Sequence, residues 1–333
     1  MDNGWPEKCS LPFPDQFDTI RPMIQLATRV EQLSEVTERK PTFVAVGSFD
    51  GVHLGHQAVL QKMVAAAQAA GTRTAVLTFF PHPKRVIQQM TEPYYLTTLD
   101  ERVRLLAKLG IDLIITHPFN DTVRHTRAAD FVAEMCQYLD MRQLWGGNFA
   151  LGYKREGDIP FLRKLGEEKG YTVAQVEAMV MWQGERVSSS RIRRSLLEGD
   201  LAEVNGCLGR PYQISGTIVK GAQMGRTIGF PTANIDYWPE QLLPDNGVYA
   251  TYAWLDDERH VAATNVGVRP TVNGSAVTVE AHLLDFDADI YGRTLRLEFI
   301  DRIRPEMKFP GLDTLKAQIG ADVQRVRELM SSN

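Results

Sequence analysis

The sequence predicts an α/β protein in two parts: a parallel sheet with helices on both faces, then a small antiparallel β-barrel with a closing helix. Two observations lead to this prediction. Before Gly209, apolar strand-like runs alternate with helix-like stretches, which is the pattern of parallel strand–helix–strand units. After Gly209, short strand-like runs follow one another between Gly, Pro and Asn residues, which is typical of an antiparallel barrel.

The composition indicates an ordinary globular protein. The 333 residues are enough for about two domains, and 44% hydrophobic with 23% charged residues is typical of soluble proteins. The net charge of -4 gives no general attraction to nucleic acid or to an anionic membrane, so neither is expected as a partner. The sequence does not indicate an oligomeric state.

The cellular compartment follows from the cysteines and from the first residues. Cys9, Cys136 and Cys207 are far apart and have no Cys-x-x-Cys spacing, which argues against disulfides and zinc. Residues 1–16 lack the apolar core of a signal peptide, and no run of about 18 apolar residues occurs. We therefore expect a cytoplasmic protein without a transmembrane span.

The N-terminal elements follow in order. Residues 1–40 are expected to be a partly helical leader, because apolar residues recur at near-helical spacing over 22–38. Residues 41–208 are expected to form one domain, with strands at 42–46, 74–79, 112–116, 143–145 and 173–181 and helices at 57–70, 99–109, 128–139 and 192–198. Successive strand–helix–strand units imply parallel strands joined by right-handed crossovers.

Residues 209–333 are expected to form the second domain. Its predicted strands are 214–219, 248–254, 261–266, 277–284 and 295–300, and its helix is 312–330. The apolar stripe of that helix would cover the barrel. Because the motifs described below lie on opposite sides of Gly209, we expect two independent cores and two separable chemistries.

The first motif runs from Gly47 to His56 and follows the strand 42–46. Glycines between a strand and a helix predict a tight turn, and the unpaired amides at a helix start favour a phosphate. His53 and His56 are three residues apart, hence on one face of the helix, where they could stabilise developing negative charge. The alternative is that both are ordinary turn residues. The chain has no Gly-x-x-x-x-Gly-Lys-Ser/Thr sequence.

Two further turns follow later strands. The turn Pro81-His82-Pro83 ends the strand 74–79, and the glycine-rich, polar stretch 146–158 follows the strand 143–145. Ligands of parallel sheets bind at the carboxyl ends of the strands, where both the His53/His56 turn and the Pro81-His82-Pro83 turn would emerge, so the latter is a candidate substrate loop. The alternative for the Pro81-His82-Pro83 turn is that its prolines only end the strand.

A serine and arginine cluster precedes the last helix of this half. Arg191 and Arg193 follow three serines at 188–190, and arginines near free helix amides can bind a triphosphate in bidentate fashion. The alternative is that the serines are only helix caps.

In the second half, the candidate binding and catalytic residues are concentrated in the stretch 216–234. Its glycines allow close approach of the backbone to a bulky anion, and Lys220 and Arg226 add positive charge. Thr232 and Asn234 offer the oxygen ligands that magnesium prefers. The alternative is a glycine-rich hairpin loop without a ligand.

These motifs resemble those of one enzyme family. The string Phe-Asp-Gly-Val-His-Leu-Gly-His-Gln at 49–57 resembles the bacterial FAD synthetase branch of the nucleotidylyltransferase superfamily, whose His-x-Gly-His element binds the phosphates of ATP. The Pro-His-Pro turn, the Gly-x-Asn-Phe-x-x-Gly loop at 146–152 and Ser-Ser-Ser-Arg-Ile-Arg at 188–193 are similar to further elements of that branch. Gly-Phe-Pro-Thr-Ala-Asn at 229–234, with 265–271 and 279–285, resembles riboflavin kinase. The resemblance extends from about residue 41 to the C-terminus.

The resemblance implies a bifunctional enzyme. A C-terminal kinase would make FMN from riboflavin and ATP, and an N-terminal sheet of the nucleotidylyltransferase type would make FAD and pyrophosphate from FMN and ATP, with Mg²⁺ as cofactor. It implies catalytic roles for His53, His56, Arg191 and Glu280, with Glu280 as the base, and Mg²⁺ ligands at Thr232 and Asn234. The implied binding residues are Gly47, Phe49, Asp50, Gly55, Pro81, His82, Asn148, Ser189, Ser190, Arg193, Gly216, Lys220, Gly221, Gly225, Arg226, Gly229, Pro231, Asn265 and Arg304.

Two other functions remain open at this stage. The first is a riboflavin kinase with a weakened or inactive adenylyltransferase half, because Phe80 replaces an expected polar residue and Trp145 and Ala150 match loosely. The intact His-x-Gly-His and arginine motifs count against it. The second is a non-catalytic flavin-binding regulator, which would have no reason to keep Glu280 beside the magnesium residues.

Overall fold

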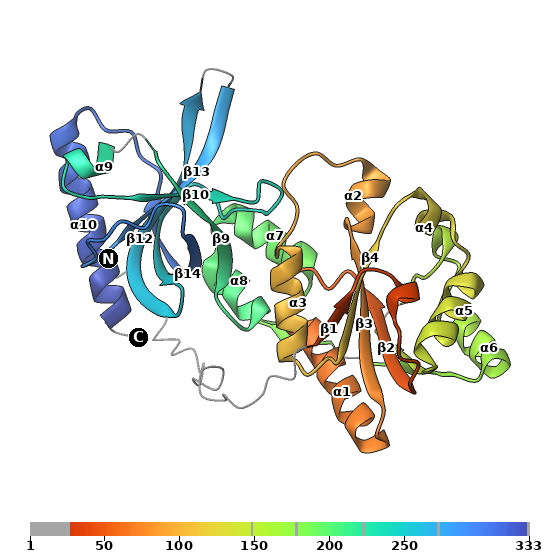
Figure 1. Cartoon of the computed structure of the whole chain (residues 1–333). Helices are drawn as coiled ribbons and strands as arrows, with labels where there is room; N and C mark the ends of the chain where they lie inside the picture. Colours follow the sequence, from red (N-terminus) through yellow and green to blue (C-terminus); the bar gives the residue numbers. More distant parts are fainter. Residues whose placement is uncertain (1–26, 148, 177–178, 222–223, 272–273, 332–333) are drawn as a thin grey trace.

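The computed structural model describes residues 27–147, 149–176, 179–221, 224–271 and 274–331. A sheet unit and a barrel lie side by side, and the helices α7 (Ser189–Glu198) and α8 (Leu201–Leu208) lie between them (Figure 1). No helix of the described part is long and apolar enough to cross a membrane.

The N-terminal unit contains a six-stranded parallel sheet of order β1-β4-β3-β2-β5-β6. Its strands are β1 (Thr28–Val30), β2 (Thr42–Gly47), β3 (Arg73–Phe80), β4 (Leu113–Pro118), β5 (Met141–Gly146) and β6 (Thr172–Gln175). The smaller elements of this unit are α2 (Pro83–Gln88), α4 (Asp121–His125), two short 3₁₀ helices at Leu33–Glu35 and Tyr153–Arg155, and the hairpin β7 (Met181–Trp182) and β8 (Glu185–Arg186).

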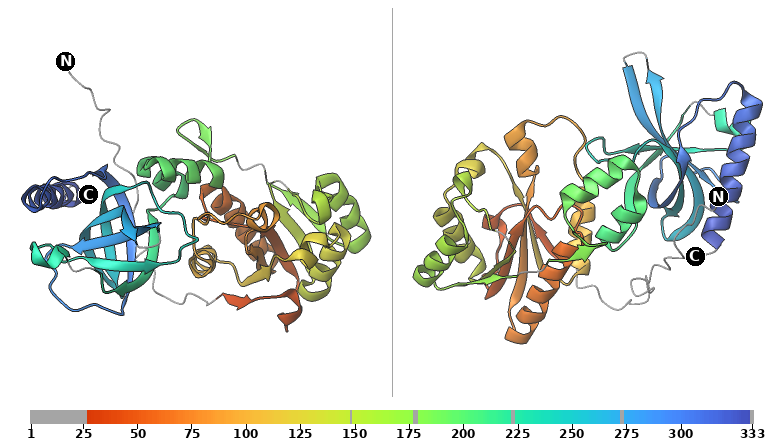
Figure 2. Two further views of the ribbon diagram at one scale, coloured as in Figure 1. Left: turned by 90° about the horizontal axis from the view of Figure 1, so that it is seen from above. Right: turned by 180° about the vertical axis from the view of Figure 1, so that it is seen from behind.

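Helices cover both faces of this sheet, as predicted (Figure 2). Helices α1 (Leu54–Ala70) and α3 (Leu99–Lys108) pack on one face, and α5 (Ala128–Leu139) and α6 (Ile159–Lys169) on the other. Along β2, Phe43 and Ala45 pack against the first pair of helices, whereas Val44 packs against the second. Because both faces are buried, the strands read as continuous apolar runs, which explains why they were predictable.

Three predicted elements differ in the structure. The helix expected at 22–38 is wrong in its described part: Thr28–Val30 is an edge strand that pairs with Leu113–Ile115, since β-branched residues fit a half-buried strand. The strand expected at 173–181 ends at Gln175, and residues 181–182 belong to the β7–β8 hairpin. Helix α7 begins at Ser189 rather than at residue 192, because the Ser188 hydroxyl caps it by accepting a bond from the Arg191 amide.

The C-terminal unit is a closed antiparallel barrel of order β10-β13-β12-β11-β14-β9. Its strands are β9 (Tyr212–Val219), β10 (Ala233–Tyr237), β11 (Gly247–Leu255), β12 (Glu258–Thr271), β13 (Gly274–Leu283) and β14 (Thr294–Pro305), and the helices are α9 (Met224–Thr227) and α10 (Leu312–Ser331). The predicted barrel and its closing helix are confirmed. Strand β10 was missed because it begins at the end of the stretch 216–234, which the sequence presents as a glycine-rich loop.

One hydrophobic core crosses the boundary at Gly209. Ile192 and Leu196 of α7 and Val204 of α8 belong to the same buried cluster as Ile214 and Phe299 of the barrel. The expectation of two independent cores is therefore wrong, because the barrel and the last helices of the N-terminal half bury each other's apolar surface.

Candidate active sites

The predicted phosphate turn lies between β2 and α1. His53 is the residue before the first turn of α1, and its Nδ1 accepts a hydrogen bond of 3.3 Å from the His56 amide. The two imidazole rings stack with their centroids 3.7 Å apart. A Cβ at Gly55 would lie 3.1 Å from the His53 ring, so glycine lets the two rings keep this position.

A cavity of about 280 Å³ opens at this turn. Five residues predicted from the sequence line it: Gly47, Phe49, His53, Gly55 and His56. Arg186 and Ser188 also line it. Ser188 belongs to the predicted serine and arginine cluster, whereas Arg186 was not predicted. The signal for Arg186 was present, since it is a positive charge just before the serine run.

Burial favours the neutral form of both histidine rings. Burial lowers the pKa of His53 to about 4, although the Asp50 carboxylate opposes this shift. Burial also lowers the pKa of His56 well below its ordinary value, with His53 and Arg102 adding to the effect. Among the described residues, the buried Nδ1 atom of His56 has no hydrogen-bond partner. A polar atom of this kind is suited to a ligand.

Asp50 is buried and makes structural contacts, and it does not line the cavity. Its side chain is 1% exposed and accepts hydrogen bonds from the amides of Leu96 and Thr97 at 3.1 and 3.2 Å. Its oxygens lie 3.4 Å from Arg102 and 2.5 Å from Arg193. Burial alone would raise the pKa of Asp50, but the charges of Arg102 and Arg193 outweigh it and lower that pKa.

Arg193, which pairs with Asp50, does not line this cavity. Its guanidinium donates to the Tyr94 carbonyl at 2.8 Å and lies 3.7 Å from the centroid of the Tyr94 ring. Its charge contributes to lowering the pKa values of His53, His56 and His82. The guanidinium is thus within electrostatic range of the histidine turn and of the Pro81-His82 turn.

Arg191 has a different environment from the one predicted. It forms an ion pair with Glu203 of α8 and donates to the carbonyls of Trp182 and Glu185 at 3.0 and 2.7 Å. It does not line the histidine cavity. The Ser189 hydroxyl donates to the Asp50 carbonyl at 3.1 Å, and Ser190 is exposed.

The Pro81-His82 turn follows β3 as predicted, at the same sheet edge as the histidine turn. The His82 amide donates to the Tyr95 hydroxyl at 2.8 Å, and its Nδ1 accepts from the Lys84 amide at 3.1 Å. Burial lowers the pKa of His82 to about 4. Asn148 lies outside the described residues.

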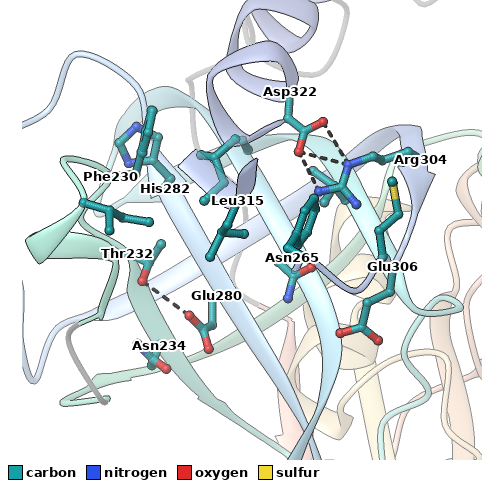
Figure 3. Close-up of a pocket in the computed structure, with 17 residues that line it drawn as sticks. Phe230, Thr232, Asn234, Asn265, Glu280, His282, Arg304, Glu306, Leu315 and Asp322 are labelled. Atoms are coloured by element: carbon teal, nitrogen blue, oxygen red, sulfur yellow. Dashed lines mark hydrogen bonds and ion pairs between the residues drawn. The ribbon is translucent and has the colours of Figure 1, made fainter. Parts of the chain in front are cut away.

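A second cavity, of about 400 Å³, lies in the barrel unit (Figure 3). Six predicted residues line it: Gly225, Thr232, Asn234, Asn265, Glu280 and Arg304. This volume is in the range of small-molecule sites.

Strand register brings the polar side chains of this cavity together. Asn234 on β10 and Asn265 on β12 are both register partners of Glu280 on β13. The Thr232 hydroxyl donates to a Glu280 carboxylate oxygen at 3.4 Å (Figure 3). Hydroxyl, carboxamide and carboxylate oxygens are the donors that fit Mg²⁺. The described residues contain no group of three or more His, Cys, Asp or Glu that could hold a metal by themselves.

Helix α10 forms one wall of the barrel cavity. Its residue Asp322 is 4% exposed and accepts hydrogen bonds from Nε and Nη2 of Arg304, at distances of 2.8 to 3.0 Å (Figure 3). Gln318 donates to the same carboxylate at 2.9 Å, and Leu315 and Ile319 line the cavity. The closing helix was predicted only to cover the barrel. The signal for more was Asp322, an acidic residue within the apolar stripe.

The predicted glycines permit close backbone packing. A Cβ at Gly216 would lie 2.3 Å from the Asp236 carbonyl oxygen, and one at Gly221 would lie 2.4 Å from Nδ2 of Asn234. A Cβ at Gly225 would lie 2.3 Å from the Phe230 carbonyl oxygen. Gly229 has a φ of 90°, which favours glycine.

The remaining predicted residues of the barrel unit lie outside the cavity lining. The Lys220 ammonium is 5.7 Å from the centroid of the Tyr291 ring, and Arg226 is exposed. The Pro231 carbonyl bonds with Nδ1 of His282 at 2.8 Å, and this contact places the His282 ring in the cavity wall.

Comparison with known proteins identifies both halves. The family model for FAD synthetase matches residues 35–191, and that for riboflavin kinase matches residues 208–330. The bifunctional riboflavin kinase/FMN adenylyltransferase of Listeria monocytogenes is 37% identical over 85% of this chain and 91% of its own length. The corresponding Escherichia coli K12 protein is 35% identical over 92% of this chain and 97% of its own.

A solved structure has the same fold along nearly the whole chain. It is a crystal structure described as a macrolide-efflux protein from Streptococcus pneumoniae, with a TM-score of 0.81 and 28% identity over 91% of this chain and 99% of that one. The efflux activity in its name is attributed to that protein alone, and the match supports the shared fold. On the two matched models and the curated relatives together, this chain belongs to the bifunctional riboflavin kinase/FMN adenylyltransferase family.

Proposed function

We propose that the barrel cavity phosphorylates riboflavin and that the histidine cavity adenylylates the resulting FMN. The observation that carries this proposal is that each cavity gathers the side chains suited to one reaction. Glu280, Thr232 and Asn234 meet in the barrel, and His53 and His56 meet at the start of α1. ATP serves as co-substrate in both.

In the kinase step, Glu280 would accept the proton of the riboflavin 5′-hydroxyl. That oxygen would attack the γ-phosphorus of ATP, the bond to the bridging oxygen would break, and ADP would leave. Thr232 and Asn234 would hold Mg²⁺, which when bound neutralises phosphate charge. Gly221 and Gly225 would keep the backbone close enough to shape the site, because a Cβ at either position would meet Asn234 or the Phe230 carbonyl.

In the adenylyl transfer, a phosphate oxygen of FMN would attack the α-phosphorus of ATP and pyrophosphate would leave. The neutral imidazoles of His53 and His56 would donate N–H groups to the phosphates, and these donors are already in place before reaction. Arg186 in the lining and Arg193, whose charge acts on both histidines, would add positive charge. The step needs no nucleophile from the protein.

The same proposal extends to the cellular compartment and to the partners of the protein. The free thiols of Cys136 and Cys207 suit a reducing cytoplasm. The chain's net charge of -4 suits small phosphorylated substrates held by local charge rather than nucleic acid or membrane partners.

One incubation decides between this proposal and the two other functions. Purified protein is supplied with riboflavin, ATP and Mg²⁺, and the flavins are separated by chromatography. We expect FAD. FMN alone would indicate a kinase with an inactive adenylyltransferase half, and the absence of product would indicate a flavin-binding regulator.

Two variants test the assignment of each cavity. His53→Ala removes one preorganised donor, so FAD formation from supplied FMN should fall about 10²–10³-fold. Glu280→Gln cannot accept a proton, so FMN formation from riboflavin should fall about 10²–10⁴-fold. Each variant is the control for the other, because each should leave the second reaction intact. Equal loss of both reactions in either variant would refute its assignment.

A further inference from the structure

A segment of the barrel unit leaves the barrel and contacts the sheet unit. This bridging segment is Trp238–Leu242, directly after β10, and it extends towards the connection between α2 and α3 (Figure 1). The amides of Tyr94 and Tyr95 donate to the Glu240 carbonyl at 2.9 and 3.1 Å, and the Leu242 amide donates to the Tyr95 carbonyl at 2.8 Å. The backbone of one unit is therefore hydrogen-bonded directly to the backbone of the other.

Gln241 anchors the bridging segment in the interior. Its side chain is 1% exposed, and its Nε2 donates to the Leu96 carbonyl at 3.3 Å and to the Gln213 carbonyl at 3.0 Å. Gln241 also forms a parallel bridge with Tyr95. Bonds to both units from one buried side chain fix the segment more firmly than a surface contact would.

Aromatic contacts connect the bridging segment to the predicted substrate turn. The Trp238 ring lies 4.7 Å from the Tyr95 ring and 6.1 Å from the Phe80 ring, measured between centroids. Phe80 directly precedes Pro81, and the Tyr95 hydroxyl accepts the bond from the His82 amide. Trp238 thus supports the Pro81-His82 turn indirectly, through its contacts with Phe80 and Tyr95.

The stretch that the bridging segment holds also fixes the charged centre of the site. Leu96 and Thr97 donate their amides to Asp50, and the Tyr94 carbonyl accepts from Arg193. A shift of residues 94–97 would therefore move the Pro81-His82 turn and Arg193 together.

We propose that Trp238 of the kinase unit is a positioning residue for FMN in the adenylyltransferase site. It would act through Tyr95 and Phe80, since Trp238 is not among the residues that line the two described cavities. The inference rests on the proposed function, and it further assigns the Pro81-His82 turn, a candidate substrate loop at the same sheet edge as the histidine turn, to the flavin side of that site. It implies that binding of FMN for the second reaction depends on a residue of the unit that performs the first.

The test is the steady-state kinetics of full-length Trp238→Ala supplied with FMN and ATP. The KM for FMN should rise about 3- to 10-fold, which is the value of one or two aromatic contacts. Because the reacting groups are untouched, kcat should change less than about 2-fold, and riboflavin phosphorylation should be unaltered. Trp238→Phe keeps a ring against Tyr95 and should restore most of the FMN affinity. A titration of bound FMN by fluorescence gives the same shift without turnover.

A matched variant separates positioning from general stability. Trp254 is also a half-buried tryptophan of the barrel unit, but it packs on Arg296 at 4.7 Å, so Trp254→Ala should leave the KM for FMN unchanged. If Trp238→Ala lowered kcat with an unchanged KM, or lowered both reactions equally, the contact would be only structural and the inference would fail. Should Trp238→Ala not fold, Trp238→Leu, which keeps apolar volume without a ring, gives the same comparison.

His82→Ala distinguishes failure of this inference from failure of the proposed function. If His82→Ala raises the KM for FMN and the Trp238 variants do not, the turn binds flavin but Trp238 does not position it. If His82→Ala leaves that KM unchanged, the flavin-side assignment itself is refuted.

Discussion

Replacement of Gly221 by Ala should disable the kinase through a neighbour. A Cβ at Gly221 would lie 2.4 Å from Nδ2 of Asn234 and 2.5 Å from its Cγ and Oδ1, whereas non-bonded atoms need about 3.5 Å. The Asn234 side chain must therefore move by about 1 Å. Because it can rotate away, the protein should stay folded, but a 1 Å misplacement of a group at the site costs about 10²-fold in rate.

The assay compares two variants, each supplied with either riboflavin or FMN. Riboflavin-fed reactions of Gly221→Ala should form FMN about 10²-fold more slowly, and FMN-fed reactions should form FAD at the normal rate. Gly311→Ala is the control, since a Cβ there would meet no described atom within 4 Å. Equal FMN formation by the two variants would show that Asn234 does not act in phosphoryl transfer, or that the loop can absorb the methyl group.

Two predictions concern the adenylyltransferase half. Asp50→Asn leaves Arg102 and Arg193 buried without a counter-charge, so the free energy of unfolding from urea denaturation at pH 7 should fall by about 3–5 kcal/mol. The folded-state pKa of Asp50 is lowered, so the stabilisation by the Asp50 carboxylate is present above about pH 4 and is lost as the pH falls further. Below about pH 4 the free energy of unfolding of Asp50→Asn should therefore fall less steeply than that of the unchanged protein. His53 favours its neutral form when folded, so stability should decline as the pH falls from about 6.5 towards its folded pKa of about 4. An NMR titration of the His53 ring should accordingly show a midpoint near 4.

A specific outcome would contradict each of these two predictions. An Asp50→Asn variant as stable as the unchanged protein would mean that the two guanidiniums find water or other acceptors. A His53 midpoint at the ordinary histidine value would mean that water reaches the ring in solution, and the proposed neutral donor would then be a cation over part of the working range.

Local sequence patterns predicted the features that depend on neighbouring residues. The turn between β2 and α1 was predictable because glycines, a helix start and two histidines occur within ten residues of one another. The barrel site was predictable for a similar reason: Thr232 and Asn234 are only two residues apart, and the oxygen atoms of both side chains suit the same ligand.

The features that were missed depend on contacts between residues far apart in the chain. Asp50 reads as part of a phosphate loop, but its partners Arg102 and Arg193 are 52 and 143 residues away. Arg191 has the chemistry of an anion-binding residue, and only the packing of α7 on α8 shows that Glu203 pairs with it. A sequence gives the chemistry of a side chain, whereas the partner that uses it is set by tertiary packing.

The shared core changes how separability of the two reactions should be measured. A substitution of Leu196 or Phe299, which belong to one buried cluster, would destabilise both units and lower both rates by the same fraction of unfolded protein. A substitution at a cavity lining acts on one rate only. The ratio of the FMN-fed rate to the riboflavin-fed rate therefore separates the two cases, because unfolding cancels in the ratio and local chemistry does not. By this measure Glu280→Gln should raise the ratio and His53→Ala should lower it, while Phe299→Leu should reduce both rates and leave the ratio unchanged.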